Sequence, residues 1–224
     1  MKKYELTNET KEFGTRTLYR IRALRDIPKH EVVAGDLGGW VESESNLSQD
    51  GNSWVSGDAR VSGNARVSGD ARVSGNARVS GDARVSGNAR VSGDACVSGN
   101  ARVSGNARVS DDARVSGNAR VSDDARVSGN ARVSGDARVS GDARLPSRDS
   151  IFTASYVGTE NGTLTVTSGV FGLVVTRGCF TGSADEFLEK SKEFHDDKTH
   201  NEYRMLIDVA KSRIPVHAVP DTKD

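Results

Sequence analysis

The stretch VSGDARVSGNARVSGDAR, residues 55–72, decides the fold, because it begins a six-residue repeat that dominates the chain. The unit V-S-G-[DN]-A-R runs from Val55 to Arg144 without insertion or deletion, which makes 15 hexads. A period of this kind indicates a stacked repeat architecture rather than a globular core. The departures from the unit are aspartate for glycine at Asp111 and Asp123, cysteine for arginine at Cys96, and Leu145 at the next valine place.

The order of side chains in each hexad places alanine and valine inside and arginine outside. In Ala59-Arg60-Val61, the first and third residues are two apart, so in an extended strand they point to the same face. Ser-Gly-[Asp/Asn] then turns the chain, because glycine permits a positive φ and Asp or Asn tolerates one. A helix is excluded, since a six-residue apolar period matches no helical stripe and nearly every unit contains glycine.

The alternation of Asp and Asn at the fourth place of the hexad indicates how many hexads form one coil. With two or four hexads per coil, most aspartates would stack on aspartates, whereas with three Asp58 lies beside Asn76 and then Asp94. Since like charges on adjacent strands repel, three hexads are favoured. That gives a triangular coil of 18 residues and five regular coils, a stack about 24 Å long. Duplication of a 12-residue unit would also explain the alternation.

V-S-G-D-A-R resembles the hexapeptide repeat of left-handed β-helix proteins, in which a small residue follows an aliphatic one four places on. The resemblance implies triangular coils, which agrees with the stacking argument, and a left-handed winding. General topology rules favour right-handed crossovers, and bactofilin-like solenoids are a right-handed alternative. The predicted fold class is therefore mainly β: a single-stranded left-handed β-helix with an N-terminal cap and a small α+β C-terminal module.

Residues 1–54 are expected to cap the exposed strand edges at the start of the solenoid at 55–145. Residues 17–24 alternate like a strand, with Tyr19, Ile21 and Ala23 on one face. Trp40 and Trp54 are interpreted as lids over the first coil. The segment GDLGGWVESESNLS, residues 35–48, is similar to the start of YdcK-like hexapeptide proteins, a bacterial and prophage group often labelled acyltransferases. This motif carries no known chemistry.

Residues 146–215 differ abruptly in composition and are predicted to form a βββαα module, followed by a tail at 216–224. Strands are expected at 150–157, 162–167 and 170–176, and helices at 183–194, which opens on a capping box, and at 201–214. The stretch G-C-F-T-G, residues 178–182, resembles one in small C-terminal modules of prophage proteins. No function comes with that resemblance.

Composition limits the class of protein. Of the 224 residues only 5% are aromatic, so a wide globular core is not expected, and 31 basic residues balance 31 acidic ones. No apolar run approaches the roughly 20 residues of a membrane helix, and we see no secretory signal. The two cysteines have no CxxC spacing. Free thiols and a cytoplasmic location are therefore expected.

Candidate catalytic residues are scarce. Acyltransferases of the left-handed β-helix class use a coil histidine as general base, but His30, His195, His200 and His217 all lie outside the hexads. Residues 194–200 hold two histidines and two aspartates, which we interpret as a solvated loop rather than a metal site. The sequence predicts no catalytic residue, no cofactor and no metal.

The arginines of the hexads are the candidate binding surface, because three hexads per coil would align them in columns. The hexads hold 14 arginines and 10 aspartates, a net charge of +4. One interpretation is a lattice of surface pairs with the corner aspartates; the other is a regular anion- or partner-binding surface. The hexads lack aromatic residues, which weakens the case for single-stranded nucleic acid. The candidate residues are Arg60, Arg66, Arg72, Arg78, Arg84, Arg90, Arg102, Arg108, Arg114, Arg120, Arg126, Arg132, Arg138 and Arg144.

From the residues and the resemblances we predict a non-enzymatic scaffold or interaction protein of bacterial or prophage origin. Its partner is expected to be a host macromolecule, a protein before a nucleic acid or nucleotide, and a homo-oligomer is an open alternative. A host-directed or counter-defence role rests on the resemblance alone. An acyltransferase relative without activity and an anion binder that uses the arginine columns are the alternatives.

Overall fold

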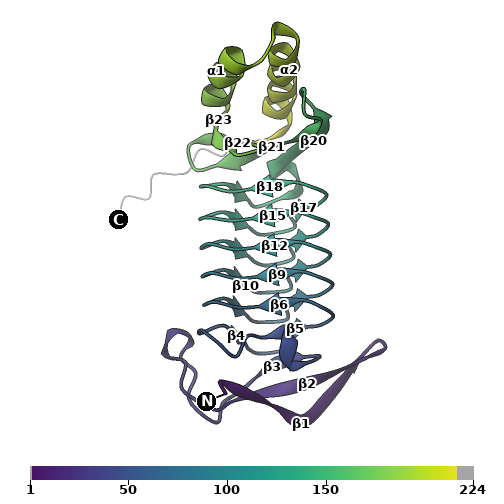
Figure 1. Cartoon of the computed structure of the whole chain (residues 1–224), viewed down its shortest axis with the longest axis vertical. Helices are drawn as coiled ribbons and strands as arrows, with labels where there is room; N and C mark the ends of the chain where they lie inside the picture. The colour runs from purple at the N-terminus through teal and green to yellow at the C-terminus, as the bar shows by residue number, and fades with distance from the viewer. Residues whose placement is uncertain (1, 216–224) are drawn as a thin grey trace.

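The computed structural model describes residues 2–215, so the predicted tail at 216–224, which contains His217, lies outside the described residues. Stacked coils form the middle of the molecule, with a hairpin at one end and two helices over a small sheet at the other (Figure 1). The chain is mainly β, as the hexad predicted.

The repeat forms strands of two residues each, Arg-Val in almost every case, separated by the Ser-Gly-[Asp/Asn]-Ala corners. These strands are β4 (Trp54–Val55), β5 (Arg60–Val61), β6 (Arg66–Val67), β7 (Arg72–Val73), β8 (Arg78–Val79), β9 (Arg84–Val85), β10 (Arg90–Val91), β11 (Cys96–Val97), β12 (Arg102–Val103), β13 (Arg108–Val109), β14 (Arg114–Val115), β15 (Arg120–Val121), β16 (Arg126–Val127), β17 (Arg132–Val133), β18 (Arg138–Val139) and β19 (Arg144–Leu145).

Strand pairing confirms three hexads per coil. Each strand pairs in parallel with the strand three hexads further on, as Arg60 with Arg78 and Val61 with Val79. Three sheets result: β3-β5-β8-β11-β14-β17, with β1 and β2 added at its start; β4-β7-β10-β13-β16-β19; and β6-β9-β12-β15-β18. The sense of the winding stays a prediction.

Valine and alanine fill the interior of the coil, as predicted. Every alanine of the hexads is fully buried, and no hexad valine is more than 1% exposed. Burial of one valine contributes roughly 1.5–3 kcal/mol, so stability accumulates coil by coil. The corner glycines have φ near +66°, and Asp111 and Asp123 adopt φ of 58° and 57° at the same place. Both substitutions are tolerated because aspartate is among the residues that visit this region.

The solenoid begins before the regular repeat. Strand β3 (Leu37–Val41) pairs with β5, Leu47 bridges to Val67, and β4 pairs with β7, so residues 37–55 close one more coil. Its first face therefore carries six parallel strands, and the solenoid has about six turns rather than five. This extra coil is irregular, because the spacing from Val41 to Leu47 matches one hexad but the spacing from Leu47 to Val55 exceeds it.

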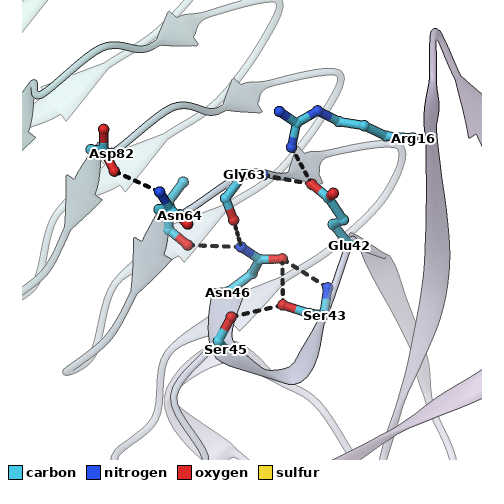
Figure 2. A network of polar contacts seen from close by, with 9 residues as sticks. Arg16, Glu42, Ser43, Ser45, Asn46, Gly63, Asn64 and Asp82 are labelled. Atoms are coloured by element: carbon cyan, nitrogen blue, oxygen red, sulfur yellow. Dashed lines mark hydrogen bonds and ion pairs between the residues drawn. The ribbon is translucent and has the colours of Figure 1, made fainter.

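A buried asparagine completes the irregular corner, as Figure 2 shows. The short 3-10 helix Glu44–Asn46 diverts the Asn46 backbone N–H to the Ser43 carbonyl oxygen, away from the ladder. The Asn46 side-chain amide takes its place, donating to the carbonyl oxygens of Gly63 and Ala65, each at 2.9 Å. Glu42 Oε2 accepts from the Gly63 N–H at 2.6 Å and pairs with Arg16, so side chains replace several backbone bonds of the ladder at this corner.

The N-terminal cap is an antiparallel hairpin laid against the first coil. Strand β1 (Tyr4–Phe13) pairs with β2 (Arg16–Ala23), and β2 pairs with β3. The strand expected at 17–24 is thus present, but β1 was not anticipated. Leu18 is fully buried, whereas Tyr19 is only half-buried. A register shift between Arg20 and Arg22 breaks the simple alternation.

The two tryptophans do not cover the end of the coil as lids. Trp40 pairs with Arg60 and Trp54 with Arg72, so both occupy the outward place of the hexad. Trp54 is nevertheless only 1% exposed and belongs to the same apolar core as the valines. Lys11 and Arg20 stack on the Trp40 ring, at 5.4 and 5.3 Å from its centroid. The end of the core is covered instead by side chains such as Tyr4 and Ile21.

The C-terminal module contains four strands, not the three predicted. Strands β20 (Ile151–Val157), β21 (Gly162–Gly169), β22 (Gly172–Arg177) and β23 (Phe180–Ser183) form an antiparallel sheet in chain order. Helices α1 (Ala184–Phe194) and α2 (Asp197–Arg213) follow. β23 was missed because G-C-F-T-G lacks a strand-like alternation. The turn at Gly178 brings it alongside β22, with which it pairs.

This sheet has two unlike faces. Leu164, Val166 and Val175 pack against the helices in a core separate from that of the solenoid. Thr165, Thr167 and Thr176 alternate with them and are also buried. The Thr165 hydroxyl accepts from the Arg138 N–H of the last coil at 3.1 Å. The solenoid therefore ends against a hydroxyl-rich surface.

Candidate functional site

Stacking at intervals of three hexads gathers the hexad arginines into three columns, one on each outer face. Directly paired neighbours such as Arg90 and Arg108 lie one strand spacing, about 4.8 Å, apart along the axis. The columns are named by their first strand. The β5 column holds Arg60, Arg78, Arg114 and Arg132; the β6 column Arg66, Arg84, Arg102, Arg120 and Arg138; the β7 column Arg72, Arg90, Arg108, Arg126 and Arg144.

The predicted lattice of arginine–aspartate pairs is not formed. Within residues 2–215, no hexad guanidinium lies within 4.0 Å of a carboxylate oxygen; the ion pairs there use cations of the cap and the C-terminal module. Five of the ten hexad aspartates accept from an asparagine amide one coil away, as Asp82 from Asn64 at 2.9 Å and Asp136 from Asn118 at 3.0 Å. Corner and column residues therefore form separate ladders, which leaves the hexad guanidinium groups of the described residues without a carboxylate partner.

Like charges within a column act on one another. The pKa of Arg126 is lowered from its ordinary value by desolvation, and then by the guanidinium groups of Arg144 and Arg108 above and below it. An arginine stays charged in spite of such a shift. An anion placed over a column would therefore relieve repulsion between neighbours as well as gain attraction to each.

The three columns are not equally open. Phe13 of the cap hairpin lies over the β5 column, with its ring centroid 4.6 Å from Arg60 and 5.6 Å from Arg78. Cys96 then interrupts this column. In the β7 column Arg72 and Arg144 are half-buried. The sequence shows Phe13 as an aromatic residue beside a hairpin turn, which could have suggested a contact residue. Nothing in the sequence indicates that it contacts arginines of later coils.

The β6 column is the most open of the three. All five of its arginines are exposed. Only Arg138, at the last coil, is engaged, by a bond from its guanidinium to the Gly178 carbonyl oxygen. A hollow of about 610 Å³ lies beside Arg66 and Arg84, under the corner that holds Glu44 and Gln49. This column offers the longest uninterrupted run of accessible cations.

The histidines lie away from the columns, except at one point. His30 is 7% exposed, and its pKa is lowered by desolvation and then by the neighbouring Arg72. His195 and His200 belong to the C-terminal module, where the ring nitrogen Nδ1 of each lies 3.3 Å from an oxygen of Ser191. Among the described residues, no group of three or more His, Cys, Asp or Glu side chains could hold a metal ion.

Two comparisons with known proteins agree with the solenoid. Residues 59–152 match the model of the bactofilin family, described as polymer-forming cytoskeletal. A stretch of 63 residues is 38% identical to the uncharacterized acetyltransferase YdcK of Escherichia coli K12. That stretch covers 25% of this chain and 19% of the length of the E. coli protein. The chain is thus similar to β-solenoid proteins along its repeat, and neither likeness extends to the whole molecule.

No helix within residues 2–215 combines the length and the apolar character that crossing a membrane requires. The helices α1 and α2 carry charged residues along most of their length.

Proposed function

We propose that this chain is a non-enzymatic scaffold of bacterial or prophage origin that binds an acidic surface of a host protein in the cytoplasm. The observation that carries the proposal is the β6 column, five exposed arginines in register with no carboxylate partner among the described residues. In this proposal residues 1–54 are the cap, 55–145 the binding rod and 146–215 a second contact module.

The rigidity of the column favours a folded partner. The middle arginines of the column, such as Arg102, are anchored on strands paired on both sides, so their Cα positions are ordered before binding and the entropy cost falls mainly on the side chains. The hexads offer no aromatic side chain on which bases could stack, which disfavours single-stranded nucleic acid. A protein face with carboxylates spread over a flat area suits this lattice better.

The test compares two triple variants of equal charge. Arg84, Arg102 and Arg120 in the β6 column are changed to glutamine in one; Arg78, Arg114 and Arg132 in the interrupted β5 column are changed in the other. Wild type and both variants are used to capture partners from host lysate at about 50 and about 300 mM salt. We expect an acidic protein that is held by wild type and the β5 variant, lost in the β6 variant and released by salt.

Equal loss in both variants would indicate a general effect of charge and contradict the column proposal. Retention of the same partner by both variants, or at high salt, would contradict it as well. Circular dichroism of each variant checks that the solenoid is intact, since the substituted side chains are exposed.

Self-assembly is a second candidate, favoured by the likeness of residues 59–152 to polymer-forming proteins. Both ends of the rod are covered by the cap and the C-terminal module, so copies of the whole chain would have to associate through their sides. Light scattering over a wide range of concentration distinguishes a defined oligomer from a monomer.

An acyltransferase related to YdcK-like proteins is the enzymatic alternative, supported by the partial match to a protein of that printed name. The hexads carry neither a histidine nor an inserted loop that could form an acceptor pocket. We expect a flat titration with acetyl-coenzyme A. Saturable binding, or release of free coenzyme A in the presence of amine or hydroxyl acceptors, would contradict the non-enzymatic proposal.

A further inference from the structure

A second hollow lies in the C-terminal module, away from the arginine columns and independent of them. Its volume is about 410 Å³, within the range of roughly 300–1,000 Å³ typical of small-molecule sites. The turn before β21, the end of β22, the start of β23 and one face of α1 all contribute to it. The lining includes Cys179 and Phe180 of the G-C-F-T-G stretch, for which the arginine-column proposal has no role.

Aromatic rings form one side of this hollow. Phe180 and Phe187 have centroids 5.3 Å apart, and Phe187 meets Tyr203 edge-on at 5.1 Å. His195 meets the other side of Tyr203 at 5.5 Å. Phe194, also in the lining, is 71% exposed. A flat ring entering here would find several aromatic edges and faces for offset or edge-to-face packing.

A fixed guanidinium lies in the same hollow. The Arg177 side chain is 12% exposed; its Nε donates to the Tyr203 hydroxyl at 3.2 Å and its Nη2 to the Val157 carbonyl oxygen at 3.1 Å. Gly158 and Gly162 permit this arrangement, because a Cβ at the first would clash with the Tyr203 hydroxyl and a Cβ at the second with the Arg177 guanidinium. Nη1 has only a contact of 3.9 Å with Glu160, which is 84% exposed.

Charge in the lining favours a single negative charge on the ligand. Lys190 lies over the Phe180 ring at 5.3 Å and is the second cation of the lining beside Arg177, and Glu160 is its one carboxylate. The C-terminal end of α1, at Phe194 and His195, borders the same space, and a helix C-terminus disfavours a concentrated double negative charge such as a phosphate. Carboxylates also match the edge of a guanidinium group.

We infer that this hollow binds a small aromatic carboxylate, with its carboxylate at Arg177 and Lys190 and its ring among Phe180, Phe187 and Phe194. The ligand displaces the exposed Glu160 from Arg177. The same chemistry is found in a free aromatic acid and in the C-terminal residue of a peptide that ends in phenylalanine. One hollow would thus give the C-terminal module its own ligand.

The experiment titrates the full chain with phenylacetate and with phenylacetamide, its neutral analogue, and follows amide chemical shifts of the module. We expect saturation by the acid with a Kd on the order of 1 mM, as suits so small a probe, and no saturation by the amide. Peptides that end in phenylalanine, with a free or an amidated C-terminus, form the second arm. Tighter binding of the free-acid peptide than of phenylacetate identifies a peptide terminus as the source; weaker binding identifies a free acid.

Two exposed substitutions should act in opposite directions. Lys190→Gln removes a cation and should weaken binding about threefold or more, whereas Glu160→Gln removes the competing carboxylate and should strengthen it by a similar factor. Lys192→Gln, on α1 but outside the lining, is the matched control and should change nothing. Equal binding of acid and amide, absence of saturation, or indifference to both substitutions would overturn the inference. Benzylphosphonate is a further probe with the same ring and a phosphonate in place of the carboxylate. Tighter binding of benzylphosphonate than of phenylacetate would overturn the inference as well.

Discussion

Each end of the solenoid has an apolar core and strand edges that must be covered, and the two ends are covered by different groups. At the N-terminal end, Tyr4, Ile21 and Ile27 join the apolar core of the coils, so cap and solenoid share one interior. At the C-terminal end, the module keeps a core of its own, and Ile151 is the one apolar side chain it packs against the solenoid core in the described residues. The first end is an integral part of the rod, whereas the second is a separate fold placed on it.

The ladder explains why the ends need different polar groups. In each hexad the N–H groups of Arg and Ser donate to carbonyl oxygens one coil further on, as Arg60 to Ala77 and Ser62 to Val79. The parallel pairing of Arg60 with Arg78 and of Val61 with Val79 also uses the valine N–H and the arginine carbonyl oxygen in the opposite direction. The edge of the first coil therefore presents mainly carbonyl oxygens, at the alanine, valine and glycine places, with one N–H group at each valine place. The edge of the last coil presents mainly N–H groups, at the arginine, serine and Asp/Asn places, together with the arginine carbonyl oxygens, and buried groups of both kinds need partners.

The N-terminal cap supplies donors for those carbonyl oxygens. Tyr4 Oη donates to the Leu47 carbonyl at 2.8 Å, and Lys3 Nζ to the Ser53 carbonyl at 2.8 Å. Arg25 Nη2 donates to the Gly51 carbonyl at 2.9 Å. Leu47, Ser53 and Gly51 stand at the valine, alanine and glycine places of the first coil. The cap is thus complementary to this end of the ladder in polarity as well as in shape.

The other end is matched by an acceptor, by a missing donor and by one donor, because the Ser168 hydroxyl donates to the Arg144 carbonyl oxygen. Thr165 Oγ1 accepts from the Arg138 N–H, and Pro146 occupies the serine place that follows the last hexad. Proline has no N–H, so one donor of the last coil is absent rather than unpaired. The difference between the ends follows from the direction of the ladder.

The largest effect is expected from removing both ends. A chain of residues 37–150 exposes a strand edge richer in carbonyl oxygens at one end and one richer in N–H groups at the other, so copies can add head to tail without closure. We expect filaments, seen by negative-stain electron microscopy. Chains lacking only residues 1–36 or only the module should not form filaments, because a chain with one exposed end can add only one copy, which closes the assembly. Filaments from either single truncation would contradict the assignment of residues 1–36 and the module as the covers of the two ends.

The separate cores should unfold separately. Ile21→Ala removes a buried side chain from the shared core and should destabilise the solenoid by about 2–5 kcal/mol. Phe187→Ala, in the core of the module, should cost about 3–5 kcal/mol there and leave the solenoid unchanged. Scanning calorimetry measures both as shifts of two different transitions. A single transition displaced by both substitutions would show that the ends are coupled.

The buried lysine of the cap should give the N-terminal end its own pH dependence. Burial lowers the pKa of Lys3 to about 8, so between pH 8 and its unfolded pKa the unfolded chain binds the extra proton and stability rises with pH. Burial raises the pKa of Tyr4, so above about pH 10 the unfolded chain loses a proton first and stability falls. Thermal unfolding at pH 7 to 11 should therefore show a maximum near pH 10.

Lys3→Met is the variant that tests this origin. It removes the titrating group, so the rise above pH 8 should disappear whatever the stability of the variant at neutral pH. A rise that persists would assign the effect to other groups.

The smallest effects are expected in the regular coils between the ends. Asp111 Oδ2 accepts from the Gly129 N–H at 3.0 Å, which compensates for its positive φ. Asp111→Gly should change stability by less than about 1 kcal/mol, because relief of strain offsets the lost bond, whereas Asp111→Ala should cost about 1–2 kcal/mol. Urea unfolding of both variants measures the difference. Equal stabilities of the Gly and Ala variants would show that the positive φ causes no strain here, so that there is nothing for the Asp111–Gly129 hydrogen bond to offset.

Prediction from sequence was accurate where contacts are local and repeated. The hexad determines its own neighbours, so the inward Ala59 and Val61, the outward Arg60 and the coil of three hexads were all correct. The fourth strand of the module, β23, and the first strand of the chain, β1, were missed. Each is held extended by the neighbouring strand with which it pairs, and this pairing is not visible in its own sequence. The arginine–aspartate lattice was wrong, because asparagine amides one coil away, rather than arginines, bond half of the hexad aspartates.

By itself the sequence determined a β-solenoid of three-hexad coils with a thin Val/Ala interior and arginines outside, since one short pattern repeated 15 times leaves each coil a single way to bury its apolar groups. Only the tertiary structure decided which arginine column stays open, which donors and acceptors cover the two ends, and that an aromatic hollow forms around Arg177. Those features join residues far apart in the chain, and their geometry depends on the direction of a ladder that exists only once the coils are stacked.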